Sequence, residues 1–143
     1  MKLAARTEYA AIALLELAAH YGSGEPVQVR RIADENGIPA RFLVQILLQL
    51  KGAGLVASTR GAAGGYQLVK PPEEITLLDV VTVIEGPRDP LPASNAAPDS
   101  PSAQVLLGAW QRVAQRERAA LEETTFADLV AERNAQTEDM YYI

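Results

Sequence analysis

Residues 55–69 read "LVASTRGAAGGYQLV", two short runs of β-prone residues on either side of "GAAGG". This pattern predicts a β-hairpin with alternating faces, Tyr66 and Leu68 on one side and Gln67 and Val69 on the other. The glycines allow the loop to turn through positive φ and to approach another surface closely. A phosphate-cradling nucleotide loop is the rival interpretation. It fails because no Gly-Lys-Ser/Thr follows and the segment does not lead directly into a helix.

The segment before the hairpin predicts two helices joined by "GIP". Residues 28–36 form the first helix and Gly37 ends it, while Pro39 suits the start of the second, which runs to about residue 54. Helical spacing divides the second helix into an apolar inner face and a polar outer face. The inner face carries Phe42, Leu43, Ile46, Leu47 and Leu50, and the outer face carries Arg41, Gln45 and Gln49. An earlier helix is predicted over residues 7–21, capped by Thr7 and stopped by Gly22.

A helix-turn-helix followed at once by a hairpin is the element order of a winged helix. In that arrangement Arg60, at the base of the hairpin loop, is placed to reach into a DNA minor groove or onto a phosphate. Its alternative role is that of a solvated cation at the hairpin edge. Arg41 and Gln45 can make bidentate contacts with bases, or can simply belong to an exposed helix face. Leu48 shares that polar face without an evident reason, and would pack either on the first helix or on a second subunit.

The sequence after the hairpin predicts three more helices. Thr76 and Asp79 have capping-box spacing before a helix with an apolar face (Leu77, Val80, Val81 and Ile84) that stops at Gly86. Residues 87–101 contain five prolines and predict an extended, exposed loop. A longer helix is expected from Ser102 to about Glu123, with Leu106, Trp110, Val113 and Leu121 on a face interrupted by Glu117. Thr125 and Asp128 form a second capping box before the last helix.

The composition excludes several classes of protein. The chain has 143 residues, 48% of them apolar, which suits one compact domain or a small domain with an appendage. There is no cysteine, which excludes disulfides, zinc sites with cysteine ligands and cysteine-held iron–sulfur clusters. No apolar run approaches the roughly 20 residues needed to span a bilayer. We therefore expect a soluble, cytoplasmic protein without membrane contacts.

The charge is unevenly distributed along the chain. Residues 26–70 carry six cations and two anions, for +4, whereas residues 1–25 carry −1 and residues 71–143 carry −8. A basic segment in an acidic protein suggests a local surface for a polyanion, although chance clustering of solvated side chains is the alternative. With no cysteine, a single histidine (His20) and no acidic cluster beside it, the chain offers no nucleophile–base pair for an enzyme.

The residues described above resemble the Rrf2 family of bacterial winged-helix transcription regulators. The resemblance covers nearly the whole chain, from "MKLAARTEYAAIALLELA" through the glycine-rich hairpin and "ITLLDVV…IEGP" to the long later helix. It implies a homodimer in which the long helices of two subunits pack together. It also implies that Arg41, Val44 and Gln45 meet the major groove and that Arg60 meets the minor groove.

The chain departs from the family in one respect. Many members bind an iron–sulfur cluster through three cysteines in the loop that matches residues 87–101, with a further ligand from the first helix. Here that loop has no cysteine, and Glu8 near the first-helix position is a single carboxylate. Because cluster iron requires thiolate ligands, we expect no intrinsic metal and no cofactor.

The sequence therefore predicts a mainly α fold with a small β-hairpin wing, that is, a winged helix-turn-helix plus a long dimerisation helix. The expected divisions are a DNA-binding domain (1–86), a proline-rich loop (87–101), and the dimerisation and C-terminal helices (102–143). The predicted DNA-binding residues are Arg30, Arg31, Arg41, Val44, Gln45, Arg60, Gly61, Gly64 and Gly65, and the predicted dimer contacts are Leu106, Trp110 and Val113.

The expected function is that of a homodimeric regulator that binds double-stranded DNA at a palindromic operator. The alternative is a winged helix kept as a protein-interaction module. His20 is expected at the surface of a helix end, and Trp110 in an interface or in the core. Regulation would come through a small effector beside the long helix, a partner protein or simple abundance, and Asp89 and Asp99 are at most a weak cation site.

Overall fold

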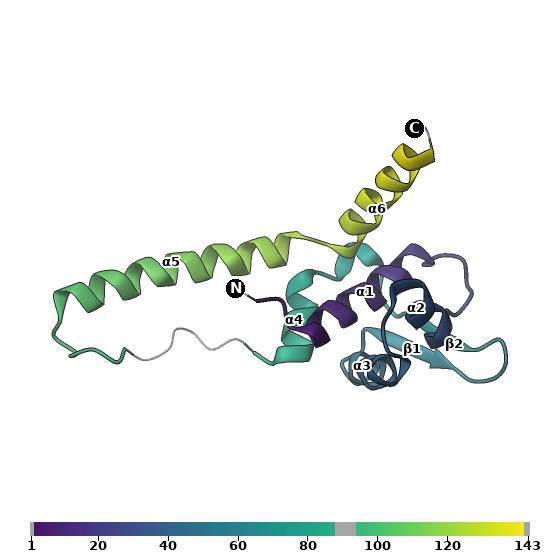
Figure 1. Ribbon diagram of the computed structural model, residues 1–143, viewed down its shortest axis with the longest axis horizontal. Coiled ribbons are helices and arrows are strands. Elements are labelled where there is room, and N and C mark those ends of the chain that lie inside the picture. Colours follow the sequence, from purple (N-terminus) through teal and green to yellow (C-terminus); the bar gives the residue numbers. More distant parts are fainter. Residues whose placement is uncertain (1, 88–93, 142–143) are drawn as a thin grey trace.

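The computed structural model describes residues 2–87 and 94–141. Its elements, in chain order, are α1 (Ala5–Ala19), α2 (Val29–Asn36), α3 (Ala40–Gly52), β1 (Val56–Thr59), β2 (Gly65–Leu68), the 3-10 helix η1 (Pro72–Glu74), α4 (Leu77–Glu85), α5 (Pro101–Glu123) and α6 (Phe126–Tyr141). In Figure 1, α1 to α4 and the hairpin form one body, from which α5 extends to the left and α6 rises. The predicted mainly α fold with one hairpin is confirmed.

Helix α1 lies at the centre of the body and contacts α3, α4 and α6. Its Ala and Leu side chains are buried on the face that includes Leu14 and Leu17. The inner face of α3 packs against them through Leu43, Ile46, Leu47 and Leu50, which are all buried. Phe126 at the start of α6 is fully buried in the same cluster, so the last helix shares the core of the winged helix.

The predicted role of Thr7 as a helix cap is wrong. Helix α1 begins after Ala4, which makes no side-chain cap, and Thr7 is buried within the first turn. Its hydroxyl donates a hydrogen bond to Oε2 of Glu85 at 2.9 Å, at the end of α4. The hydroxyl therefore has a tertiary partner, which a local spacing rule cannot reveal.

The helix-turn-helix is confirmed. Gly37 ends α2 in the left-handed conformation (φ 64°), and Pro39 is the N-cap of α3. Two predictions for α3 are wrong. Helical spacing puts Phe42 on the core face, but 42% of it is exposed. The same spacing puts Gln49 on the outer face, but it is half-buried, and its Nε2 donates to the carbonyl oxygen of Val83 (2.9 Å).

The hairpin that the β-prone runs predict is present and antiparallel, and it pairs Val56 with Leu68 and Thr59 with Gly65. A contact with the helix-turn-helix extends it. The Val27 N–H donates to the Tyr66 carbonyl (2.9 Å), and the Tyr66 N–H donates to the Val27 carbonyl (2.8 Å). These bonds attach β2 to the segment that leads into α2. The wing is therefore positioned by the body as well as by its own turn.

Both predicted capping boxes are present. At α4 the Thr76 N–H donates to Asp79 (2.9 Å) and the Asp79 N–H donates to the Thr76 hydroxyl (3.3 Å). Thr125 and Asp128 make the same pair of bonds at 3.2 and 3.1 Å. The long helix starts slightly earlier than predicted, because Ser100 is its N-cap and Pro101 its first residue. Residues 88–93 of the predicted proline-rich loop, which include Asp89, lie outside the described residues.

Candidate nucleic-acid interface

The outer face of α3 is an uninterrupted exposed surface. Arg41, Val44, Gln45 and Leu48 are all exposed, and their spacing of three and four residues places them on one side of the helix. The opposite side of α3 is the buried one described above. Leu48 is 54% exposed, so it does not pack on α1, one of the two places that the sequence suggested for it.

Arg41 is held in place by its neighbour. Its guanidinium carbon lies 4.9 Å from the centroid of the Phe42 ring, which is a cation–π contact. The exposed ring of Phe42 therefore contacts a surface cation rather than the core. An arginine with a restricted side chain loses less entropy when its planar group makes a bidentate contact.

The wing carries its cation on an exposed loop. Arg60 follows directly after β1 and is exposed. Two hydrogen bonds brace the hairpin against the helices. Lys51 Nζ at the end of α3 donates to the Ser58 hydroxyl (2.7 Å), and Gln28 Nε2 before α2 donates to the Ala62 carbonyl (2.9 Å). These braces were not visible in the sequence, because neither residue type nor local spacing marks them.

The wing glycines have separate structural reasons. Gly61 has φ +105°, a conformation that other residues rarely adopt. A Cβ on Gly64 would overlap the carbonyl oxygen of Thr59, and one on Gly65 would overlap that of Val27. The other surface that the glycine-rich loop approaches is therefore the protein's own backbone.

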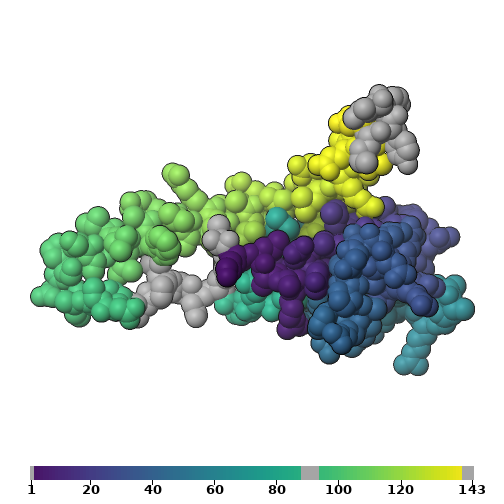
Figure 2. Space-filling view, in the orientation of Figure 1, coloured from purple at the N-terminus to yellow at the C-terminus, as the bar shows by residue number. Residues whose placement is uncertain are grey.

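The two arginines of α2 differ in their contacts. Arg30 and Arg31 are both exposed, but Arg31 Nε makes an ion pair with Oε1 of Glu35 at 3.0 Å. An exposed pair of this kind is weak, so a phosphate can replace the carboxylate. The elements that carry the predicted DNA-binding residues are neighbours, since α3 contacts both α2 and β1. In Figures 1 and 2, α3 and the wing form the lower edge of the molecule, and the wing loop projects from it.

The predicted dimer residues lie on α5, away from that edge. None of the 23 residues of α5 is buried. Leu106, Trp110 and Val113 are 63%, 59% and 55% exposed, and their spacing aligns them in one strip along the helix. Trp110 is therefore not a core residue of this chain, and the interface prediction for it remains untested.

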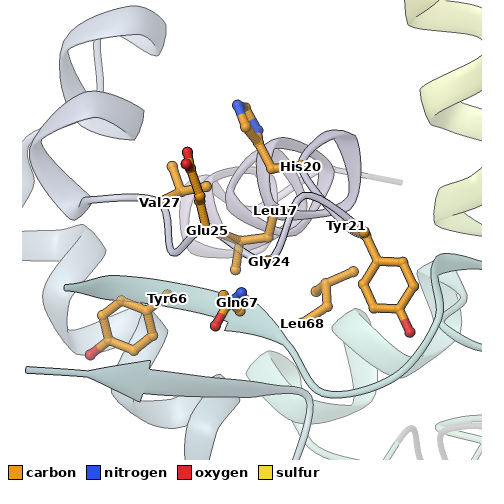
Figure 3. A pocket seen from close by; sticks show the side chains of 10 residues that line it. Leu17, His20, Tyr21, Gly24, Glu25, Val27, Tyr66, Gln67 and Leu68 are labelled. Atoms are coloured by element: carbon orange, nitrogen blue, oxygen red, sulfur yellow. The ribbon is translucent and has the colours of Figure 1, made fainter. Parts of the chain in front are cut away.

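A hollow of about 330 Å³ lies between the end of α1, residues 22–27 and β2. His20, Tyr21, Glu25 and Tyr66 are among its lining residues. Figure 3 shows the imidazole of His20 and the rings of Tyr21 and Tyr66 pointing in different directions rather than toward one another. His20 Nδ1 donates to the Glu16 carbonyl at 2.9 Å, within α1. A ligand site needs converging polar groups, and these side chains do not converge.

The comparisons with known proteins agree with this arrangement. A family described as "Rrf2: Iron-dependent Transcriptional regulator" matches residues 3–132. The HTH-type transcriptional regulator CymR of Bacillus subtilis (strain 168) is 34% identical over 144 residues, with 100% of both chains covered. Protein rrf2 of Nitratidesulfovibrio vulgaris is 36% identical over 132 residues, covering 91% of this chain and 87% of that protein.

Solved structures are similar as well. The structure of CymR (YrzC), the global cysteine regulator of B. subtilis, has a TM-score of 0.80 and 33% identity, covering 92% of this chain and 98% of that one. That of T. potens IscR has a TM-score of 0.75 and 30% identity, covering 93% and 88%. These similar proteins are transcriptional regulators and not enzymes. None of the helices formed by residues 2–87 and 94–141 is long and apolar enough to cross a bilayer.

The family description names iron, and the residues of this chain do not fit an iron–sulfur cluster. Such clusters are held by cysteine thiolates, and the chain has no cysteine. Within the described residues no three side chains of His, Asp or Glu lie together as metal ligands. Glu8, near the family's first-helix ligand position, is exposed in the first turn of α1.

With an exposed α3 face beside a glycine-rich wing, a family match over residues 3–132 and relatives of similar length, the chain belongs to the Rrf2 family of helix-turn-helix transcriptional regulators.

Proposed function

We propose that the protein is a homodimeric DNA-binding regulator that recognises a palindromic operator without an iron–sulfur cluster. The homodimer is inferred from one observation, the exposed apolar strip of α5. We define this strip as Leu106, Trp110 and Val113. These three large side chains are each more than half exposed on a helix that buries none of its residues. Soluble monomers rarely expose a contiguous apolar patch of this kind.

A second copy of the chain can cover the apolar strip of α5. Helix α5 is about 35 Å long at 1.5 Å per residue, so two copies can pack along much of their length. A two-fold axis brings the same strip of both subunits together, and each side chain then meets apolar neighbours rather than water. The same axis presents two α3 helices and two wings to one DNA duplex. Such a dimer binds half-sites separated by about one helical turn, roughly 34 Å.

The proposed roles in DNA binding follow from position and chemistry. Arg41, Val44 and Gln45 lie on the exposed face of α3 and would meet base edges in the major groove. Arg60, on the wing, would enter the minor groove or contact phosphate. Arg30 and Arg31 on α2 would contact the backbone, and Gly61, Gly64 and Gly65 would act by shaping the wing loop that carries Arg60 to the DNA.

In this proposal residues 1–86 form the DNA-binding unit and α5 the dimerisation element. Helix α6 belongs structurally to the first of these, since its Phe126 is buried in the core of the winged helix. The rival function is a winged helix that binds a protein partner instead of DNA. The +4 charge of residues 26–70 favours DNA, because a module that had lost DNA binding would not need this cluster of exposed cations.

A salt titration tests the assignment of roles. Genome-wide footprinting supplies the operator, and binding to operator and random duplex is then measured for wild type, Arg60→Ala and Arg41→Ala. Arg60→Ala should weaken binding to every sequence and reduce the salt slope by about one unit for each phosphate that Arg60 neutralises. Arg41→Ala should cost about 1–3 kcal/mol on the operator and relax preference at particular positions.

Two results would change the proposal. If Arg60→Ala weakens only operator binding and Arg41→Ala weakens both equally, the roles of wing and recognition helix are exchanged. If wild type fails to bind random duplex at low salt and neither substitution matters, the protein-interaction module is the correct function. Arg116→Ala, which removes an exposed cation on α5 outside the basic segment, is the matched control for a nonspecific loss of charge.

A further inference from the structure

Two exposed apolar side chains lie among the polar ones on the outer face of α3. Val44 is 42% exposed and Leu48 is 54% exposed. They are four residues apart, so they are neighbours on the helix surface. Both differ from Leu43 and Leu47 on the same helix, which are fully buried. No local pattern explains an exposed leucine at position 48, and the fold of the single chain does not cover it.

Leu48 occupies the middle of the face that the helix presents to solvent. At 100° per residue it points between the directions of Val44 and Gln45, close to that of Arg41. Leu48 is also about 10 Å further along the helix axis than Arg41, which corresponds to roughly three base pairs of duplex. Val44 and Leu48 share the face that Arg41 and Gln45 would turn toward the base edges, so with α3 lying along the major groove they are placed to meet bases too.

We infer that Val44 and Leu48 recognise thymine through its C5-methyl group in the major groove, an inference that rests on the proposed function. That methyl is the apolar group that a base pair displays there, whereas the remaining positions are hydrogen-bond donors or acceptors. A leucine or valine pressed against those polar edges would remove water without replacing its hydrogen bonds, which costs free energy. The two side chains therefore favour A·T pairs with a correctly placed thymine and disfavour G·C pairs at the same positions.

The side chains around Val44 and Leu48 favour DNA as their binding partner over an apolar surface of another protein. Arg41 and Gln45 lie on the same face, and Arg60 stands on the neighbouring wing, all of them exposed. A partner protein that covered Leu48 would have to bury or pair these polar groups as well. On DNA these groups have partners, because guanidinium and amide groups bind purine edges in the major groove and Arg60 would meet the minor groove or a phosphate.

Deoxyuridine substitution tests this inference, because it removes the methyl group and leaves every hydrogen bond of the base unchanged. Each thymine of the operator half-site is replaced in turn, and affinity is measured for wild type and for Leu48→Ala. Wild type should lose about fourfold in affinity at one or two thymines per half-site, the value expected for one buried methyl. Leu48→Ala should lose a similar factor on the thymine operator and should no longer respond to deoxyuridine at one of those positions.

Val69→Ala is the matched control, since Val69 is 56% exposed but lies beyond β2 rather than on α3. It should respond to deoxyuridine as wild type does. The unfolding midpoint of Leu48→Ala should match wild type, because the side chain is exposed in the free protein. If wild type binds the operator but no deoxyuridine matters, or if Leu48→Ala responds like wild type, the inference is overturned while the proposed function stands. If wild type binds neither operator nor random duplex, the proposed function itself fails.

Discussion

Helices α1 and α5 differ in where their apolar side chains find contacts. Seven of the 15 residues of α1 are buried, whereas none of the 23 residues of α5 is. Leu14 of α1 is fully buried, while Leu106 of α5 is 63% exposed. The difference shows that α1 is stabilised by packing within the chain. The exposed strip of α5 (Leu106, Trp110 and Val113) has no such packing, so its role must be sought outside the chain.

The largest effect is expected from a charge placed on the apolar strip. Trp110→Glu should convert the dimer to monomers, because an ionised carboxylate would be buried without a partner in the interface. Operator affinity should fall by about 10²–10⁴-fold, since each half-site is then bound without the gain from linked sites. Gel shifts and sedimentation measure the two effects. The control is Gln111→Glu, which adds the same charge at the next residue, off the strip, and should leave the dimer and the operator affinity unchanged. If Trp110→Glu is still dimeric at micromolar concentration, the interface lies elsewhere.

The next prediction makes the same chemical change in both helices. Leu14→Ala should reduce the free energy of unfolding by about 3 kcal/mol, since it leaves a cavity in the core. Leu106→Ala should change the unfolding of the dilute, monomeric protein by less than about 0.5 kcal/mol, yet should weaken dimerisation. Urea titration at low protein concentration gives the first comparison. Equal losses for the two variants would mean that α5 packs within its own chain.

A smaller effect is expected from the contact between α1 and α6. Glu16 is buried, and its Oε1 lies 3.6 Å from Arg133 Nη2 and 3.4 Å from Asn36 Nδ2. Arg133→Ala should cost about 1–2 kcal/mol of stability, because it leaves a buried carboxylate with only an amide partner. Arg116→Ala removes the same charge from exposed α5 and should cost almost nothing in the same urea titration. If Arg133→Ala is equally neutral, α6 does not hold the Glu16 carboxylate in place.

The features predicted correctly from the sequence are those that depend on neighbouring residues. The capping box of Thr76 and Asp79 needs partners three residues apart, and Gly37 ends α2 through its own backbone conformation. The β-prone runs on either side of "GAAGG" likewise predict the hairpin of β1 and β2. Local rules were therefore sufficient for the helix-turn-helix and for the hairpin.

The features that were missed depend on residues far apart in the chain. Thr7 and Glu85 are 78 residues apart, and no local pattern distinguishes a hydroxyl with a distant partner from a helix cap. The bridge between Val27 and Tyr66, which attaches the wing to the body, is also nonlocal. The prediction for Phe42 is wrong for another reason: at 100° per residue it lies at the edge of the apolar face, about 90° from its centre, and 42% of it is exposed.

Trp110 offers the most direct measurement of the central claim, because it is the chain's only tryptophan and lies on the strip itself. Its fluorescence emission should be recorded over a dilution series in parallel with the sedimentation of the same samples. The account predicts a blue-shifted emission in the dimer that moves to the red as the dimer dissociates, since 59% of the side chain is exposed in the single chain. A protein that stays monomeric at all concentrations, or a dimer whose tryptophan emission is that of an exposed indole, would contradict the assignment of α5 as the dimerisation helix.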